Sequence, residues 1–180
     1  MHTALPSLIA DLPADAVVTD PDIVASYRQD RALDPDAGTP IAVVRPRSTE
    51  EVQTVLRWAS AHKIAVVPRG AGTSLSGGAT AVDGGIVLTT ERMRDIVVDT
   101  ATRTAVVQPG LLNAEVKKAV AAHGLWYPPD PSSFEICSIG GNVATNAGGL
   151  CCVKYGVTTD YILGLQVVLA AVLMPLVFRL

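Results

Sequence analysis

Two glycine-rich segments carry the residue types best suited to binding an anionic ligand. The first runs from Pro68 to Gly78 and combines its glycines with Arg69 and the hydroxyl side chains of Thr73, Ser74 and Ser76. Glycine permits positive φ and close approach of the backbone, so successive N–H groups can converge on a phosphate. Each hydrogen bond to a charged oxygen contributes about 1.5–3 kcal/mol, so several would hold a pyrophosphate. The alternative is a mobile loop whose glycines only form turns.

The first segment matches neither of the two common nucleotide-binding fingerprints. No Gly-Lys-Ser/Thr ends it, and Leu75 stands where the third glycine of the Gly70-x-Gly72-x-x-Gly pattern should be. If it binds phosphate, it does so in another structural setting.

The second segment extends from Ser132 to Gly149 and sets small and amide side chains between Gly140-Gly141 and Gly148-Gly149. Pro128-Pro129-Asp130-Pro131 precedes it and stiffens its approach. Such a segment lets a flat, heteroatom-rich ligand lie against the backbone. A glycine-rich packing turn is the alternative, which the presence of two such segments makes less attractive.

Catalytic and metal-binding patterns are not evident elsewhere in the sequence. The three histidines are interpreted as surface or packing residues, and Asp130 and Glu135 lack the spacing of a recognisable pair of catalytic carboxylates. Three cysteines, two of them vicinal, show no metal-ligand spacing. We interpret Cys151 and Cys152 as small buried thiols, with a redox switch as the alternative. The sequence therefore nominates no catalytic residue and no metal ligand.

Composition restricts the class of protein. The 180 residues carry 14 Lys and Arg against 17 Asp and Glu, a net charge of −3, with no basic run, which argues against nucleic-acid binding. The length suits one domain with a hydrophobic core. The N-terminus lacks a basic stretch followed by an apolar one, and free thiols fit a reducing compartment, so we expect a cytoplasmic protein.

The elements that must position the two segments can be read from periodicity. Residues 1–40 predict a lead-in of short helices and turns, with a helix starting at Asp20-Pro21. A strand over 41–44 follows, then a helix that a capping box of Ser48 and Glu51 begins and that ends near residues 62–63. A strand over 64–67 completes a βαβ unit, which closes most simply as a right-handed parallel crossover.

Further strands are predicted over 85–88, 96–98 and 104–107, the last two paired antiparallel. A second helix is expected to start with Asn113 as its cap, to carry Val116, Ala119, Val120 and His123 on one face, and to end at Gly124. Parallel and antiparallel features in one chain indicate an α+β fold.

Taken together, the two segments resemble the flavin domain of FAD-linked oxidases of the p-cresol methylhydroxylase (PCMH) and vanillyl-alcohol oxidase type. The nearest likeness is to the branch of D-lactate dehydrogenase, glycolate oxidase D-subunit and D-2-hydroxyglutarate dehydrogenase. Val153-Lys154-Tyr155-Gly156 and Gly164 to Leu169 continue the match, which spans residues 41–170 as a PCMH-type domain. The resemblance implies two α/β subdomains with FAD bound between them.

The resemblance also assigns roles to individual residues. The first segment would bind the pyrophosphate, and the second would lie along the pyrophosphate, ribityl chain and flavin. Some relatives tether the flavin through a histidine in the first segment; none stands here, which implies non-covalent FAD. The implied cofactor-binding residues are Pro68, Arg69, Gly70, Ala71, Gly72, Thr73, Ser74, Ser132, Ser133, Ser138, Gly141, Thr145, Asn146 and Gly148.

The implied function is the FAD-binding portion of an oxidoreductase that oxidises a 2-hydroxy acid of the glycolate or D-lactate type. The family places its substrate-binding residues in a later domain, which we expect to be missing from this chain. Two alternatives remain: a non-catalytic FAD- or nucleotide-binding fragment, and a sugar-nucleotide reductase of the same flavin fold. The oligomeric state stays open.

The C-terminal residues 171–180 depart from the family pattern. The family predicts a turn, typically Asp-Gly, after Ala170, whereas the sequence continues with apolar residues and no turn residue before Pro175. We expect a truncated, poorly packed apolar tail. A membrane segment over residues 162–178 is the less favoured alternative, because 17 residues fall short of the roughly 20 that span a bilayer.

Overall fold

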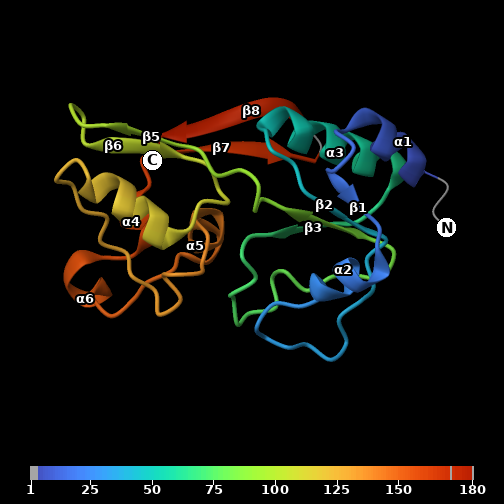
Figure 1. Ribbon diagram of the computed structural model, residues 1–180, viewed down its shortest axis with the longest axis horizontal. Coiled ribbons are helices and arrows are strands. Elements are labelled where there is room, and N and C mark those ends of the chain that lie inside the picture. Colours follow the sequence, from blue (N-terminus) through green and yellow to red (C-terminus); the bar gives the residue numbers. More distant parts are fainter. Residues whose placement is uncertain (1–3, 171, 180) are drawn as a thin grey trace.

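A computed structural model describes residues 4–170 and the backbone of 172–179, and it contains two units side by side (Figure 1). The first unit is built on a four-stranded sheet in the order β1-β2-β4-β3. Strands β2, β4 and β3 are parallel, and β1 is antiparallel to β2. The strands are β1 (Val17–Val18), β2 (Ala42–Val44), β3 (Val66–Arg69) and β4 (Ile86–Thr89).

Helices cover both faces of this sheet. Helices α1 (Leu5–Asp11) and α3 (Thr49–His62) pack on the face to which Ala42 and Val44 point, whereas α2 (Pro21–Ser26) packs on the face of Val43. Successive side chains of a strand point to opposite faces, so a strand covered on both sides is apolar at every position. This explains the continuous apolar runs in the sequence and creates two cores, one on each face.

The predicted helix starts of this unit are confirmed, with one difference of detail. The Asp20 carboxylate accepts from two N–H groups at the start of α2, and Ser48 Oγ accepts from Glu51 N at 3.2 Å. Glu51, however, reaches back to the N–H of Arg47 at 2.8 Å and not to that of Ser48, so only half of the predicted capping box forms.

The predicted βαβ unit is correct in its elements and incomplete in its topology. Strands β2 and β3 are parallel but do not pair, because β4 lies between them and pairs with both. The strand predicted over 64–67 runs instead from Val66 to Arg69, so Pro68 and Arg69 belong to β3 and not to the loop that follows. The 16 residues between β3 and β4, 70–85, therefore form the connection that holds the first glycine segment.

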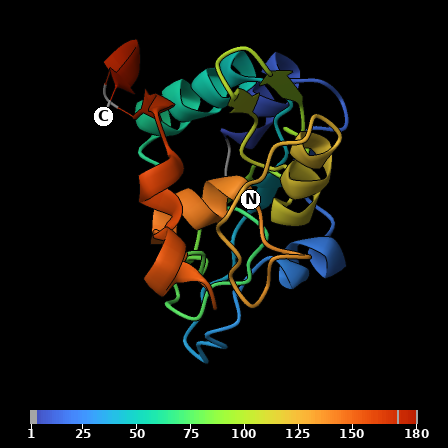
Figure 2. The same ribbon diagram turned by 90° about the vertical axis from the view of Figure 1, so that its left-hand side faces the viewer.

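The second unit consists of an antiparallel hairpin packed on two helices. Strands β5 (Ile96–Asp99) and β6 (Thr104–Val107) pair as predicted. Helices α4 (Asn113–Ala121) and α5 (Ile139–Thr145) form a small core with the hairpin, and Figure 2 views the molecule from this end. The core residues are Leu111, Val116, Val120 and Ile139.

Two predictions for α4 are wrong. The N-cap is Leu112 and Asn113 is the first helical residue, because the Asn113 side chain is buried and donates to Pro129 O at 3.3 Å. His123 lies beyond the end of the helix and is exposed, so it contributes nothing to the apolar face.

The chain continues through α6 (Cys152–Tyr155), the 3₁₀ helix η1 (Thr158–Tyr161), β7 (Gly164–Leu169) and β8 (Val172–Arg179). Strands β7 and β8 form an antiparallel hairpin, with Leu169 opposite Val172. The backbone of residues 172–179 is therefore a strand, although the sequence has no turn residue before Pro175. The expected poor packing concerns side chains of residues 171–180, which lie outside the described part. No helix among the described residues is long and apolar enough to cross a membrane.

Candidate functional site

The first glycine segment lies where the parallel strands of the first unit end. Arg69 is the last residue of β3, and Thr90 N, just after β4, donates to Arg69 O at 3.1 Å. In open sheets of this kind, ligands bind in the crevice outside the carboxyl ends of the parallel strands. The loop that begins at Gly70 therefore occupies the position at which the fold favours a ligand.

The backbone of this loop is arranged to receive an anion. Gly72 has φ +68°, a left-handed conformation that glycine adopts without strain. Within the described residues, the N–H groups of Gly72, Thr73 and Ser74 donate to no protein acceptor. Successive backbone N–H groups in a turn of this kind are a known way to build an anion-binding concavity, which makes this loop a candidate phosphate site.

Ser138 joins the two glycine segments. Its Oγ accepts a hydrogen bond from Ala71 N at 3.2 Å and another from Gly141 N at 3.3 Å. A Cβ on Gly70 would stand 2.5 Å from this oxygen, so only glycine allows such close approach. Ser138 is itself 3% exposed. The first segment of the first unit and helix α5 of the second thus meet at one buried hydroxyl.

The second segment is not a continuous loop, because helix α5 occupies its middle. The first N–H groups of α5 are satisfied by protein: Ile139 N donates to Leu111 O and Gly140 N to Pro109 O. A Cβ on Gly140 would lie 2.7 Å from Pro109 Cβ, and a Cβ on Gly149 would overlap the backbone of Asp130. Gly140 and Gly149 therefore serve close packing against the protein, Gly140 from within a helix and not from a turn.

The C-terminal end of α5 is held by the 3₁₀ helix η1. Asn146 ends α5 in a left-handed conformation, and its Oδ1 accepts from Thr159 N at 2.9 Å and from Thr159 Oγ1 at 2.7 Å. Thr158 Oγ1 donates to Ala147 O at 2.6 Å. The side-chain oxygen of Asn146 therefore already accepts two hydrogen bonds from Thr159, which leaves only the side-chain NH₂ group of Asn146 for a ligand.

The remaining predicted site residues of the second segment are placed as follows. Thr145 Oγ1 donates to Gly141 O at 3.0 Å, and Gly148 lies against Val157. Ser132 is exposed and Ser133 is half-buried. Within the described residues, no hydrogen bond joins Ser132 or Ser133 to the first loop. The structure thus brings Gly70, Ala71, Ser138 and Gly141 into contact. The other predicted site residues of the second segment do not take part in this contact.

Arg69 does not point freely into the loop. Its Nη1 donates to Gln29 O at 2.8 Å, and its guanidinium lies 5.5 Å from the ring centroid of Tyr27. Burial lowers its pKa, although the nearby Tyr27 and Asp30 act in the opposite direction. The sequence suggested Arg69 as a counter-charge for an anion, whereas its observed partners belong to a segment of the lead-in.

Tyr27 and Glu91 extend this set of contacts across the ends of the strands. Tyr27 OH donates to Glu91 Oε2 at 2.9 Å, and Arg45 Nε pairs with Glu91 Oε1 at 2.6 Å. Burial, followed by the hydrogen bond to Glu91, raises the pKa of Tyr27. Sequence reasoning missed Tyr27, Gln29, Glu91 and Thr159, because no local pattern distinguishes residues whose partners are 13 to 64 positions away.

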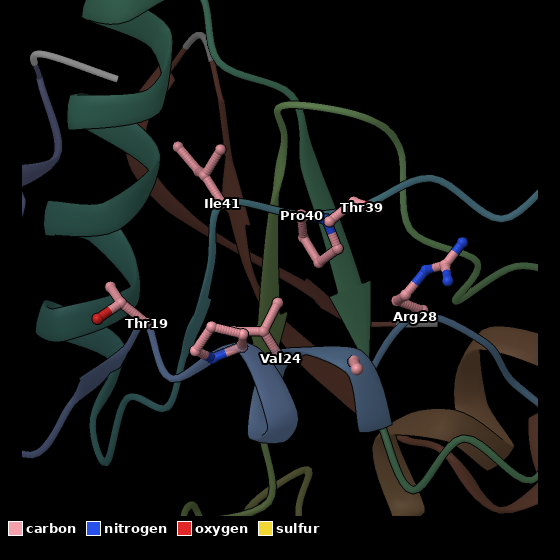
Figure 3. A pocket seen from close by; sticks show the side chains of 8 residues that line it. Thr19, Val24, Arg28, Thr39, Pro40 and Ile41 are labelled. Atoms are coloured by element: carbon pink, nitrogen blue, oxygen red, sulfur yellow. The ribbon is translucent and has the colours of Figure 1, made fainter. Parts of the chain in front are cut away.

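A surface cavity of about 320 Å³ lies elsewhere, between α2 and the residues that precede β2 (Figure 3). Val24, Arg28 and Ile41 are among its lining residues. It opens at the amino end of β2, whereas the glycine loop lies at the carboxyl ends of the parallel strands. Arg28 is tied to the carbonyl groups of Ala37 and Gly38. The cavity is therefore separate from the candidate site.

Metal chemistry has no evident site in the described part of the chain. No group of three or more His, Cys, Asp or Glu side chains there is placed to hold a metal ion. The vicinal thiols also diverge: Cys151 is exposed beside Asp130, whose hydrogen bond raises the pKa of that thiol, whereas Cys152 Sγ faces Gly148. Cys151 is thus not the buried thiol that the sequence suggested.

Comparison with known proteins agrees with this arrangement. Residues 40–171 match a family model described as "FAD binding domain". The chain is 49% identical over 132 residues to the glycolate oxidase subunit GlcD of Bacillus subtilis, which covers 73% of this chain and 28% of that protein. It is 40% identical over 168 residues to the D-2-hydroxyglutarate dehydrogenase of Stutzerimonas stutzeri, covering 91% of this chain and 36% of that protein.

A solved structure shows the same fold. A crystal structure of p-cresol methylhydroxylase with substrate bound superposes with a TM-score of 0.82 at 24% identity, covering 98% of this chain and 34% of that one. The chain thus spans about a third of the length of the proteins it matches.

Proposed function

The chain belongs to the FAD-binding domain family, and from this premise we propose that it is the cofactor-binding part of an oxidoreductase that oxidises a 2-hydroxy acid. The reaction class is supported by the names of the two relatives, a glycolate oxidase subunit and a D-2-hydroxyglutarate dehydrogenase. Those proteins are about two and a half times as long as this chain, and we propose that their substrate-binding part corresponds to sequence beyond it. A cytoplasmic location is part of the same proposal, supported by the three free thiols.

The observation that carries the proposal is the free backbone of the first loop. Three consecutive N–H groups without an acceptor among the described residues, those of Gly72, Thr73 and Ser74, begin at the left-handed residue near the carboxyl ends of the parallel strands. A dinucleotide such as FAD presents a doubly charged pyrophosphate, whose oxygens need several donors at one place. The residues present therefore fit this part of FAD.

We propose the following individual roles, which the contacts support. Gly72, Thr73 and Ser74 bind the pyrophosphate through their N–H groups, and Gly70 keeps the loop close to Ser138. Ala71 N is already bonded, so Ala71 contributes only its position. From the second segment, we assign the Asn146 amide nitrogen and the exposed Ser132 to the ribityl and flavin end. Ser133, Thr145, Gly141 and Gly148 shape the adjoining surface, while Pro68 and Arg69 act from the end of β3.

The binding is proposed to be non-covalent. The side chains of the first loop are hydroxyl, aliphatic or absent, and none is a histidine that could bond to the flavin ring. When bound, FAD supplies a two-electron acceptor for oxidation of the hydroxyl carbon. The protein's own contribution is to hold the cofactor in one orientation against the two units.

A titration tests the proposed cofactor. FAD and NAD are added separately to the purified chain, and flavin fluorescence together with protein thermal stability is followed. We expect FAD to bind with a change in its fluorescence and to raise the melting temperature, because a ligand that binds only the native state stabilises it. Tight binding of NAD without any effect of FAD would overturn the proposal.

A second experiment tests whether this chain alone can oxidise a 2-hydroxy acid. FAD-loaded protein is mixed anaerobically with D-lactate, glycolate or D-2-hydroxyglutarate, and the oxidised flavin spectrum is recorded. We expect no change within minutes, because a hydride donor must be held about 3–3.5 Å from its acceptor and a base must take the hydroxyl proton. Bleaching by any of the three acids would show that this chain contains a complete substrate site.

A further inference from the structure

The segment Tyr27–Arg31, which we call the strap, is bonded both to the end of β3 and to the first glycine loop. Gln29 O accepts from Arg69 Nη1 at 2.8 Å, at the last residue of β3. Arg31 N donates to Ser74 O at 3.0 Å, in its middle. The strap precedes residue 40, where the match to the family model begins, and its role does not follow from membership of that family.

Arg69 fills the space beneath the turn at Gly72. A Cβ on Gly72 would overlap the Arg69 guanidinium, so the side chain and the turn are in direct contact. The same guanidinium lies over the ring of Tyr27, with its central carbon 5.5 Å from the ring centroid, an arrangement that attracts a cation. Arg69 thus contacts both the strap and the left-handed turn.

The strap is anchored in turn to the ends of two further strands. Tyr27 OH donates to Glu91, just after β4, and Glu91 pairs with Arg45, just after β2. Asp30 is 4% exposed, and its Oδ1 accepts from Ala32 N at 2.9 Å, which fixes the bend of the strap. Contacts therefore run from the ends of β2 and β4 through Tyr27 to Arg69 and the loop.

We propose that Tyr27 and Arg69 form a brace that holds the first loop in its anion-binding conformation. Arg69 is then a positioning residue: it acts through the Gly72 turn and not as a counter-charge to the pyrophosphate. This inference rests on the proposed function, because it assumes that the loop binds the pyrophosphate of FAD. It adds a residue of the lead-in, Tyr27, to the determinants of cofactor affinity.

The test compares FAD dissociation constants at low and high salt for four variants of the full chain. Arg69→Lys keeps the charge but cannot both reach Gln29 O and fill the space beneath Gly72 with a planar group. We expect Arg69→Lys and Arg69→Gln to weaken FAD binding alike, by roughly 10-fold, with unchanged salt dependence. Tyr27→Leu removes the ring and is expected to weaken binding roughly 3- to 10-fold. Arg31→Gln, a matched loss of charge in the strap, is expected to stay within about 2-fold, because Arg31 bonds the loop through its backbone.

A double variant separates positioning from general destabilisation. If Tyr27 acts through Arg69, then Tyr27→Leu combined with Arg69→Gln binds FAD no more weakly than Arg69→Gln alone. Urea unfolding of each variant shows that the protein measured is folded. If Arg69→Gln does not fold, Arg69→Lys replaces it in the cycle.

The outcomes distinguish the two proposals. Parent-like binding by Arg69→Lys, together with a loss of salt dependence in Arg69→Gln, would show a direct charge contact and overturn the brace. Additive effects in the double variant, or parent-like binding by Tyr27→Leu, would also overturn it while leaving the FAD assignment intact. If the parent chain itself fails to bind FAD, both proposals fall.

Discussion

Replacing Ser138 by alanine is expected to loosen the junction between the two units. Ser138 Oγ is the shared acceptor of Ala71 N and Gly141 N, at 3.2 and 3.3 Å. Loss of a helix N-cap acceptor typically costs about 1 kcal/mol, which applies to the N–H of Gly141 in α5. Leaving a second partly buried N–H without a partner costs about 1–3 kcal/mol, which applies to Ala71. The free energy of unfolding should therefore fall by about 2–4 kcal/mol.

This change is large enough to measure in two ways. Urea unfolding followed by circular dichroism gives the free energy directly, and for a chain of this size the melting temperature should fall by roughly 4–16 °C. Ser132→Ala is the matched control, because the same hydroxyl is removed from an exposed position of the same segment. The control is expected to change stability by less than about 0.5 kcal/mol.

The same variant tests whether the junction shapes the loop. We expect Ser138→Ala to bind FAD more weakly than the parent even at temperatures where it is fully folded, because Ala71 is no longer held against α5. A free energy of unfolding equal to that of Ser132→Ala would refute the assignment of Ser138 as the shared acceptor. Unchanged FAD affinity would refute the coupling of the junction to the loop.

Two further perturbations follow from the structure. Gly72→Val should abolish retention of FAD on gel filtration, because residue 72 has φ +68° and a Cβ there meets the Arg69 guanidinium. Gly78→Ala, which has open space around its Cβ, should retain FAD. Equal retention by the two variants would contradict the loop assignment. Burial raises the pKa of Tyr127 to about 12, so the stability that Tyr127 contributes is complete below its unfolded value of 10 and is lost as the pH rises from 10 through 12. In urea titrations, Tyr127→Phe should remove this loss of stability at alkaline pH. At pH 7 its free energy of unfolding should be equal to or higher than that of the parent, because the buried hydroxyl has no partner among the described residues. The same alkaline decline in the parent and in Tyr127→Phe would show that another group causes it.

The secondary structure could be predicted well where its cause is local. The capping residues Asp20 and Ser48 stand at helix starts because a side-chain oxygen two or three positions before an N–H reaches it without help from the rest of the fold. The hairpin of β5 and β6 follows from short strands and a polar turn between them. Asn113 was misjudged because its side chain finds a more distant partner, Pro129 O, inside the core.

The order of the strands required the tertiary structure. The sequence places β2, α3 and β3 in succession, and nothing in that stretch shows that β4 inserts between the two strands. A continuous apolar run tells that a strand is buried on both faces but not which neighbour it pairs with, since all such runs look alike.

Within the candidate site, too, the two glycine segments separate what the sequence predicts from what the tertiary structure decides. Their residue types alone determined that the backbone can approach closely there and that hydroxyl donors accompany it. Only the tertiary structure decided what surrounds the glycines: N–H groups without an acceptor among the described residues at Gly72, but protein backbone at Gly140 and Gly149. Arg69 illustrates the reason, since a charged side chain near a phosphate loop is equally suited to a ligand or to the strap. Its actual partners, Gln29 O and the ring of Tyr27, stand about 40 residues away and meet it only when the first unit has folded.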